Sequence, residues 1–435
     1  MITAVARKSC VSALMFFGLL PCVLMTSAQT RYDLVLKGGH VIDPRNNIDA
    51  QADVAISKGK IAAVAPEIPT AQAQKVIDVR GLYLTPGLVD IHCHLFATTG
   101  IKDAWAGDNS VLPDGFSFRT GVTTMVDAGS SGWRNFEDFR NRVIDRAKTR
   151  VFAMLNIVGI GMITDALEQN THDMDPKVTA DMARKHKDVI VGIKSAHYQG
   201  PDWISVERAL EAGTLADIPV MVDFGYFLPD RPYYKLVTEK LRPGDISTHM
   251  YRGPVPYVDK EGKLLKYLLQ ARERGVKFDI GHGGGSFVFR NAAASVGQGF
   301  FPDSISTDLH TGSMNGAMMD MPTTMSKLLV LGVPLKEVLR ESTDNPAKQI
   351  KHPELGHLTV GAVADIAAFT LMTGQFGYVD ASNGKIEARQ RLFCEITLKD
   401  GKVVWDWNAR AAEDYRKLGE RYGVRDVDHI VLPKE

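Results

Sequence analysis

The sequence predicts an α/β protein: a (β/α)8 TIM-like barrel with a small β-sandwich domain formed from both ends of the chain. Short β-like segments occur at residues 32–79 and again near the end of the chain. Between them, eight apolar runs of strand length alternate with longer segments, several of them helix-like. Such alternation is typical of a parallel sheet covered by helices. The middle segment, residues 86–351, also matches the usual barrel size of about 250 residues.

The first segment, residues 1–28, has the features of a cleaved export signal. Arg7 and Lys8 precede an uncharged apolar run, and small residues follow as far as Ala28. The run is short for a membrane-spanning helix, which needs about 20 residues. We therefore expect an exported protein, periplasmic or secreted, with no stable membrane span after signal removal. An uncleaved anchor is the alternative.

Residues 29–85 and 352–435 are expected to form the two parts of the β-sandwich domain. The stretches "DLVLKGGHVID", "ADVAISKGKIAAVAP", "DIAAFTL" and "CEITLKDGKVVW" read as strands, with glycines at the turns. Asp400 and Gly401 form a hairpin turn signal. The polar stretch "ARAAEDYRKLGERYG" predicts a C-terminal helix on the surface.

The middle segment is expected to contain the barrel. Its eight apolar runs are "GLVDIHCHL", "GVTTMVDAG", "RVFAMLNIVGI", "VIVGIKSA", "IPVMVDF", "DISTHMY", "KFDIGHG" and "SISTDLH". Helix-like segments such as "WISVERALEAG" and "KLLKYLLQARERG" separate them. An open doubly wound sheet is the alternative, but no glycine-rich nucleotide fingerprint follows the first strand.

Charge and cysteine content limit the classes of function. The 435 residues include 51 basic and 51 acidic side chains, which argues against a nucleic-acid partner or a polybasic membrane-surface protein. Two of the four cysteines lie in the expected signal, so no disulfide framework is expected. A small-molecule substrate is the expected partner, and a homo-oligomer stays open.

Chemistry-bearing residues recur at the ends of the expected strands. His92 and His94 lie one residue apart, so alternation points both side chains to one face. In a TIM-like barrel, polar residues at the C-terminal strand ends meet at the active-site face. The other strand-end residues of this kind are Lys194, His249, His282 and Asp308. Imidazole and carboxylate donors without thiolates are consistent with zinc or a similar catalytic metal.

Lys194 is the unusual member of this set. Alternation along "VIVGIK" points its side chain inward, toward the expected metal site. Burial and nearby cations favour the neutral amine, and a neutral lysine can capture carbon dioxide as a carbamate. The two carbamate oxygens would then bridge a pair of metal ions.

The motifs "VDIHCHL", "GIKSA", "STHMY", "IGHGGGSF" and "STDLH" together resemble the amidohydrolase superfamily. More narrowly, the chain looks like the dihydroorotase-like branch of amidohydrolase/deacetylase metallohydrolases. The resemblance implies two divalent metal ions, zinc or alternatively manganese, bridged by hydroxide and by a carboxylated lysine. By this resemblance His92, His94 and Asp308 would hold the first ion. His249 and His282 would hold the second, and Lys194 would be the N6-carboxylysine that bridges them.

One departure from this branch concerns the substrate. Dihydroorotases and their close kin read His-x-His-x-Arg, and the arginine grips a substrate carboxylate. Phe96 stands at that position here, so dihydroorotase activity is not expected. Other residues of the mouth loops are candidates for substrate contact: His197, Tyr251, Arg252, Ser286, His310 and Asn315. The "GHGGGS" glycines are expected to let the backbone pass close to the metal site.

The sequence therefore predicts an exported, metal-dependent hydrolase of an amide or ester bond. A metal-bridging hydroxide would attack the carbonyl, and Asp308 would act as ligand and base. Deacetylation of N-acyl amino acids or acyl esters is the leading activity. The alternatives are a dipeptidase or cyclic amidase of the same superfamily, a one-metal nucleobase deaminase, and a barrel without metals that serves as a binding module.

Overall fold

The computed structural model describes Met1 and residues 31–431. The expected export signal, apart from Met1, lies outside the described residues. The strands of the described chain form two sheets, one of eight strands and one of seven.

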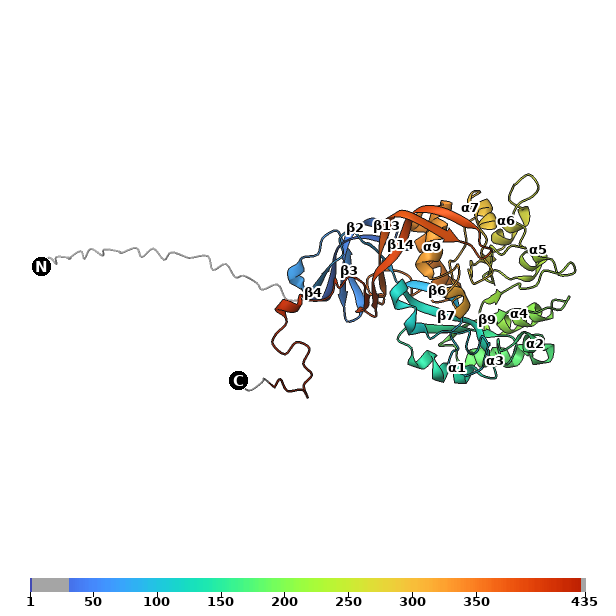
Figure 1. Cartoon of the computed structure of the whole chain (residues 1–435), viewed down its shortest axis with the longest axis horizontal. Helices are drawn as coiled ribbons and strands as arrows, with labels where there is room; N and C mark the ends of the chain where they lie inside the picture. Colours follow the sequence, from blue (N-terminus) through green and yellow to red (C-terminus); the bar gives the residue numbers. More distant parts are fainter. Residues whose placement is uncertain (2–30, 432–435) are drawn as a thin grey trace.

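The eight-stranded sheet joins the two ends of the described chain. Its order is β15-β14-β13-β5-β1-β2-β3, and β4 pairs with β1. Antiparallel pairing of β5 with β13 links the N-terminal and C-terminal strands, and Figure 1 shows the blue and red ribbons side by side. Its strands are β1 (Tyr32–Asp43), β2 (Ile48–Ser57), β3 (Lys60–Ala65), β4 (Ala73–Asp78), β5 (Tyr83–Pro86), β13 (Ile366–Val379), β14 (Lys385–Lys399) and β15 (Lys402–Asp406).

The hairpin expected at Asp400-Gly401 is confirmed. Strand β14 ends at Lys399 and β15 begins at Lys402, so these two residues form the turn. Both have positive φ, 52° and 76°, as a two-residue type I′ turn requires. Buried Leu36, Val54 and Ile396 belong to one apolar cluster that packs this sheet.

The seven-stranded sheet is curled and parallel throughout. Its order, β12-β11-β10-β9-β8-β7-β6, follows the chain, and every neighbouring pair is parallel. Its strands are β6 (Leu88–Cys93), β7 (Val122–Gly132), β8 (Arg150–Asn156), β9 (Ile190–Ser195), β10 (Val220–Val222), β11 (Ile246–Ser247) and β12 (Lys277–Phe278). Seven of the eight expected apolar runs therefore contain these strands.

The eighth run, residues 304–310, pairs with both edges of this sheet through single bridges. Ser304 pairs in parallel with Asp279, beyond β12, and Leu309 pairs in parallel with Cys93 of β6. The His94 amide donates to the Leu309 carbonyl at 2.8 Å. Asp308 consequently lies beside the end of β6, although the two are far apart in sequence.

Helices follow most strands of the curled sheet (Figure 1). The expected helices in "WISVERALEAG" and "KLLKYLLQARERG" correspond to α4 and α6. The α-helices of the described chain are α1 (Phe136–Arg142), α2 (Asp165–Glu168), α3 (Pro176–Lys185), α4 (Ile204–Ala216), α5 (Tyr233–Lys235), α6 (Lys266–Glu273), α7 (Phe289–Val296), α8 (Thr311–Met314), α9 (Met321–Leu331), α10 (Leu335–Arg340) and α11 (Asp344–Gln349).

The C-terminal helix expected at 409–423 is wrong for the described residues. That stretch contains only the short 3-10 turn η7 (Tyr415–Lys417). Its Tyr415, Leu418 and Tyr422 side chains are exposed, so no apolar face packs against the rest of the molecule. A short helix without such packing is marginal in water.

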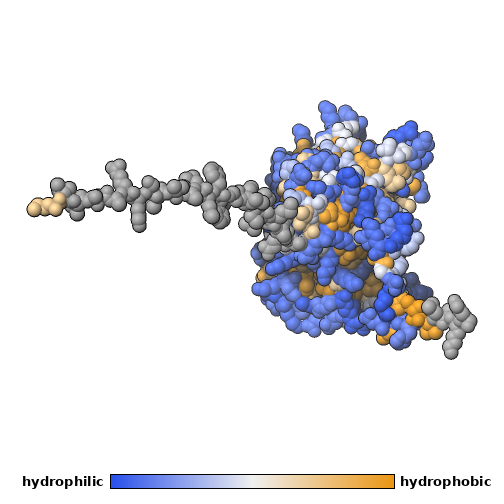
Figure 2. All heavy atoms as spheres, turned by 90° about the vertical axis from the view of Figure 1, so that its left-hand side faces the viewer, coloured by the Kyte–Doolittle hydropathy of each residue, from blue (hydrophilic) through white to orange (hydrophobic). Residues whose placement is uncertain are grey.

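The described surface is largely polar. Figure 2 shows one face covered mainly by hydrophilic side chains, with apolar ones in separate patches. None of the described helices has the length and apolar composition to cross a bilayer.

Candidate metal centre

His92 and His94 end β6 with their Nε2 atoms available. The Thr248 hydroxyl donates to Asp279 at 2.7 Å, so its oxygen accepts from His92 Nδ1 at 2.9 Å. This places the His92 proton on Nδ1 and leaves a lone pair on Nε2. His94 Nδ1 is likewise engaged, by Ser130 Oγ at 2.9 Å. Burial, together with repulsion from Lys194, lowers the pKa of His92 to about 3, so this imidazole is neutral at pH 7.

Asp308 faces both of these histidines. Its Oδ1 lies 3.1 Å from His94 Nε2 and 3.6 Å from His92 Nε2, and this buried oxygen has no hydrogen-bond partner among the described residues. Two donors bound tetrahedrally to one zinc ion lie about 3.4 Å apart. Burial opposes ionisation of Asp308, yet the two imidazoles hold its pKa well below the usual value. The three side chains thus fit one divalent ion.

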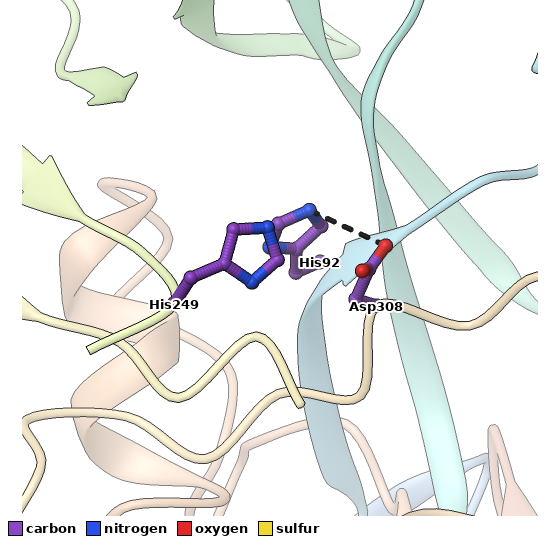
Figure 3. Close-up of side chains that lie close together, drawn as sticks. All are labelled: His92, His249 and Asp308. Carbon is purple, nitrogen blue, oxygen red and sulfur yellow. Dashed lines mark ion pairs between the residues drawn. The ribbon is translucent and has the colours of Figure 1, made fainter. Parts of the chain in front are cut away.

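His249 follows β11 and presents a third Nε2 atom. The Gly281 carbonyl, which only accepts, lies 2.5 Å from His249 Nδ1 and fixes the proton there. Donor atoms of His92, His249 and Asp308 all lie within 4.8 Å of one another. Figure 3 shows these three side chains directed toward one another, with the His92–Asp308 pair dashed.

Lys194 is buried at the end of β9, and its Nζ lies 3.0 Å from His92 Nε2. Gly129 of β7 gives its stem room, because a Cβ there would lie 2.7 Å from Lys194 Cγ. Burial lowers the pKa of Lys194, while Asp223 and Asp308 oppose the shift. The structure thus brings five of the six expected ligands together: His92, His94, Lys194, His249 and Asp308.

His282 is the expected ligand that the structure does not bring to this group. Its Nδ1 lies 2.9 Å from the Gly283 carbonyl, and its Nε2 accepts from Lys327 Nζ at 2.7 Å. Its ring stacks on Phe287 with the ring centres 4.7 Å apart. Both ring nitrogens therefore have protein partners.

The glycines around His282 bring the backbone against the site, as expected. A Cβ on Gly281 would lie 2.9 Å from the Nδ1 atoms of both His92 and His249. A Cβ on Gly283 would lie 2.3 Å from Asp308 Oδ2. Both residues also have positive φ, 46° and 54°. The backbone of this segment, and not the His282 side chain, contacts the metal ligands.

Comparison with known proteins identifies the family of this chain. A family model described as the amidohydrolase family matches residues 286–404. A deacetylase of Brucella anthropi is 33% identical over 356 residues, which cover 79% of this chain and 85% of the relative. The chain belongs to the amidohydrolase family. It is therefore a hydrolase that acts on carbon–nitrogen bonds.

Other relatives extend the comparison. A deacetylase of Agrobacterium fabrum is 34% identical over 345 residues, 77% of this chain and 82% of the relative. A crystal structure of an adenine deaminase has a TM-score of 0.77 and 28% identity, covering 86% of this chain and 100% of that one. A crystal structure of a dihydroorotase has a TM-score of 0.74 and 30% identity, covering 86% and 99%. Amidohydrolases typically use divalent metals, and the grouped donors here suit them.

Three of the six candidate substrate residues of this amidohydrolase lie in a charged network at the site. The Arg252 guanidinium donates to Ser286 Oγ at 2.9 Å and to Asp223 Oδ1 at 3.0 Å. His197 lies between two carboxylates, 2.9 Å from Glu168 Oε2 and 3.2 Å from Asp223 Oδ2. Burial opposes protonation of His197, but these carboxylates raise its pKa to about 10.

The other three candidates lie in different surroundings. Tyr251 is fully buried, and its ring packs against Tyr257 and Phe287 in the core. His310 caps α8 through Nδ1, and its ring lies 4.6 Å from that of Trp105. Asn315 is exposed, and its amide donates to the Thr311 carbonyl at 2.9 Å.

Sequence reasoning missed two residues beside the centre. Asp223 follows β10 within the run "IPVMVDF", where its strand-end position was the available signal. Trp105 lies in the loop after β6, with its ring 4.6 Å from His94. A tryptophan within a loop carries no spacing signal that would place it there.

Proposed function

We propose that this amidohydrolase cleaves an amide or ester bond of a small acylated molecule at a site for two divalent ions, zinc or alternatively manganese. The observation that carries the proposal is the meeting of three imidazole nitrogens with one carboxylate at the end of the curled sheet. The donor atoms of His92, His249 and Asp308 lie within 4.8 Å of one another. His94 Nε2 lies 3.1 Å from Asp308 Oδ1.

The ions have distinct sets of donors in this proposal. His92, His94 and Asp308 would hold the first ion, and His249 would contribute to the second. Lys194, in its carboxylated form, would supply anionic oxygens to both, because its buried amine lies beside His92 and its pKa is lowered by burial. An ammonium group cannot be a metal ligand, whereas a carbamate supplies anionic oxygens.

When bound, the ions would lower the pKa of water toward about 7 and polarise the substrate carbonyl. Asp308 accepts the proton of the attacking water at its carboxylate and returns it to the leaving nitrogen or oxygen. His92 and His94 are held by Thr248 and Ser130, which keep their Nε2 atoms directed inward.

The relatives support an acylated small molecule as the substrate. Two relatives, matched over 85% and 82% of their own length, are named deacetylase. The position at which dihydroorotases carry an arginine is Phe96, which is buried with its ring 5.0 Å from that of Phe139. Phe96 therefore offers no charge to a substrate carboxylate. Arg252 is the arginine of the candidate set; its side chain is 19% exposed and lies 3.0 Å from Asp223 Oδ1.

A nucleobase deaminase is the second candidate, since the adenine deaminase structure is 28% identical over 86% of this chain. Deamination at a one-metal site would not use Lys194. Ion content and substrate range separate the two activities.

We also propose a closed barrel, a β-sandwich and export for this protein. Bridges from residues 304–309 to both sheet edges support a closed (β/α)8 barrel, and the eight-stranded sheet supports a β-sandwich built from both chain ends.

The sequence of residues 1–28 supports export to the periplasm or the medium. The mature protein from its native host should begin near Gln29, and an intact Met1 in the cytoplasm would contradict export.

The test is a hydrolysis screen on metal-reconstituted protein. The panel contains N-acyl amino acids, acyl esters, dipeptides, cyclic amides and adenine, with Asp308→Asn as the inactive control. Turnover of an acylated compound supports the proposal. Release of ammonia from adenine by protein with one ion per chain, and no turnover of the acylated compounds, would replace it with the deaminase.

A further inference from the structure

Asp223 occupies a strand end between two residues of the centre. It directly follows β10, which pairs with β9 on one side and β11 on the other. Strand β9 carries Lys194, and His249 follows β11. Asp223 is 5% exposed, and its carboxylate reaches the His249 ring. The carboxyl ends of parallel strands meet at one edge, so this residue has the same access to the centre as its neighbours.

Asp223 and His249 contact each other through atoms that are both of a kind that binds metal ions. Asp223 Oδ2 lies 3.1 Å from His249 Nε2. The Gly281 carbonyl lies against Nδ1 of the same ring, so Nε2 is the ring nitrogen directed at this carboxylate. The spacing is close to the about 3.4 Å expected for two ligands of one tetrahedral zinc ion.

The other contacts of Asp223 orient its carboxylate. Arg252 Nη1 holds Oδ1 at 3.0 Å, and His197 Nε2 lies 3.2 Å from Oδ2. Both ring nitrogens of His197 face carboxylates, Nδ1 that of Glu168 and Nε2 that of Asp223. The carboxylate is thereby fixed with Oδ2 directed at His249. Hydrogen bonds from neighbouring side chains are typical of carboxylates that bind metals.

We propose that Asp223, together with His249, binds the second metal ion, in the place that the sequence suggested for His282. This inference rests on the proposed function, since it concerns the same two-ion site. It assigns one carboxylate to each ion, Asp308 to the first and Asp223 to the second. Carboxylate oxygen suits harder ions such as manganese better than imidazole nitrogen does. Since it has one imidazole where the first position has two, the second position should accept manganese more readily than the first.

The test measures ion content and ion affinity, independently of turnover. Asp223→Asn keeps the shape of the side chain and removes the charge. Glu168→Gln is the matched control, because it also removes a buried carboxylate that contacts His197 but lies on the ring's other nitrogen. Elemental analysis and chelator competition are run on both variants and the parent, with thermal unfolding to confirm that each is folded.

We expect two ions per chain in the parent and in Glu168→Gln, and one tightly held ion in Asp223→Asn. A second variant, Asp223→His, offers a nitrogen the same number of bonds from the backbone as Oδ2 and should regain the second ion. Two ions at parental affinity in Asp223→Asn would overturn the inference and leave the two-ion function intact. A parent with one ion, kept in Asp223→Asn, would overturn both.

Discussion

His249 and His282 follow neighbouring strands, β11 and β12, yet the side chains that face their Nε2 atoms differ. Each has a backbone carbonyl at Nδ1, Gly281 for His249 and Gly283 for His282, so each directs a lone pair from Nε2. The Nε2 atom of His249 faces the Asp223 carboxylate at 3.1 Å. That of His282 faces Lys327 Nζ at 2.7 Å. A strand-end position thus brings both histidines near the site, but the group opposite Nε2 differs: a carboxylate for His249 and the amine of a helix lysine for His282.

The largest effect should follow from removing the carboxylate that faces the histidines of β6. Asp308→Asn removes an anionic donor and the proposed base, so turnover should fall by roughly 10³–10⁴-fold, the upper range for a general base. Steady-state kinetics at saturating zinc measures this loss. A variant within tenfold of the parent would show that Asp308 is not the base.

The next effect concerns Lys194, whose Nζ lies 3.0 Å from His92 Nε2. Lys194→Ala should lose or weaken the second ion and reduce turnover by more than the roughly 10–100-fold typical of an outer partner of a metal ligand. Added short carboxylic acids should partly restore activity, because they supply bridging oxygens in the vacated space. Two ions and full turnover without any acid would exclude the carbamate, as would an unmodified lysine mass in active, fully metallated enzyme.

Thr248 should have a smaller effect, since it acts on His92 only through Nδ1. Thr248→Val removes the acceptor that keeps the His92 proton away from Nε2. Metal affinity should fall by about 10–100-fold. Thr343→Val is a matched control, because the Thr343 hydroxyl bonds to the Leu339 carbonyl outside the site. Equal affinities for the two variants would contradict a role of Thr248 in orienting His92.

Lys327, on the His282 side, should affect stability and leave the ions in place. Its buried amino group donates to His282, the Ala317 carbonyl and the Val379 carbonyl. Lys327→Met leaves these acceptors unpaired, so the free energy of unfolding should fall by about 1–3 kcal/mol. Denaturant unfolding measures the change, and elemental analysis should still find two ions. Loss of an ion from this variant would connect His282 with the metal site.

Much of the site could be predicted from the sequence, because residues at the ends of strands can be recognised from the local apolar pattern. Alternation along β6 pointed His92 and His94 to one face, and runs ending in Lys194 and His249 brought those residues beside them. Asp308 came from a run that forms only two bridges, but its apolar pattern was still visible.

The remaining features depend on contacts that no local pattern encodes. Lys327 belongs to α9 and satisfies His282 from a distant part of the chain. Asp223 directly follows β10, and its proposed role as a ligand depends on its contact with His249 Nε2, which the sequence does not reveal. The stretch 409–423 has helix-forming composition, but tertiary packing that would stabilise a helix is missing there in the described structure.

The most direct test of the whole account compares the two histidines by ion content. His249→Gln and His282→Gln replace each ring with an amide of similar size, and the second amide can still accept from Lys327. Elemental analysis after dialysis against a weak chelator should find one ion per chain in His249→Gln and two in His282→Gln. One ion in His282→Gln and two in His249→Gln would contradict the account.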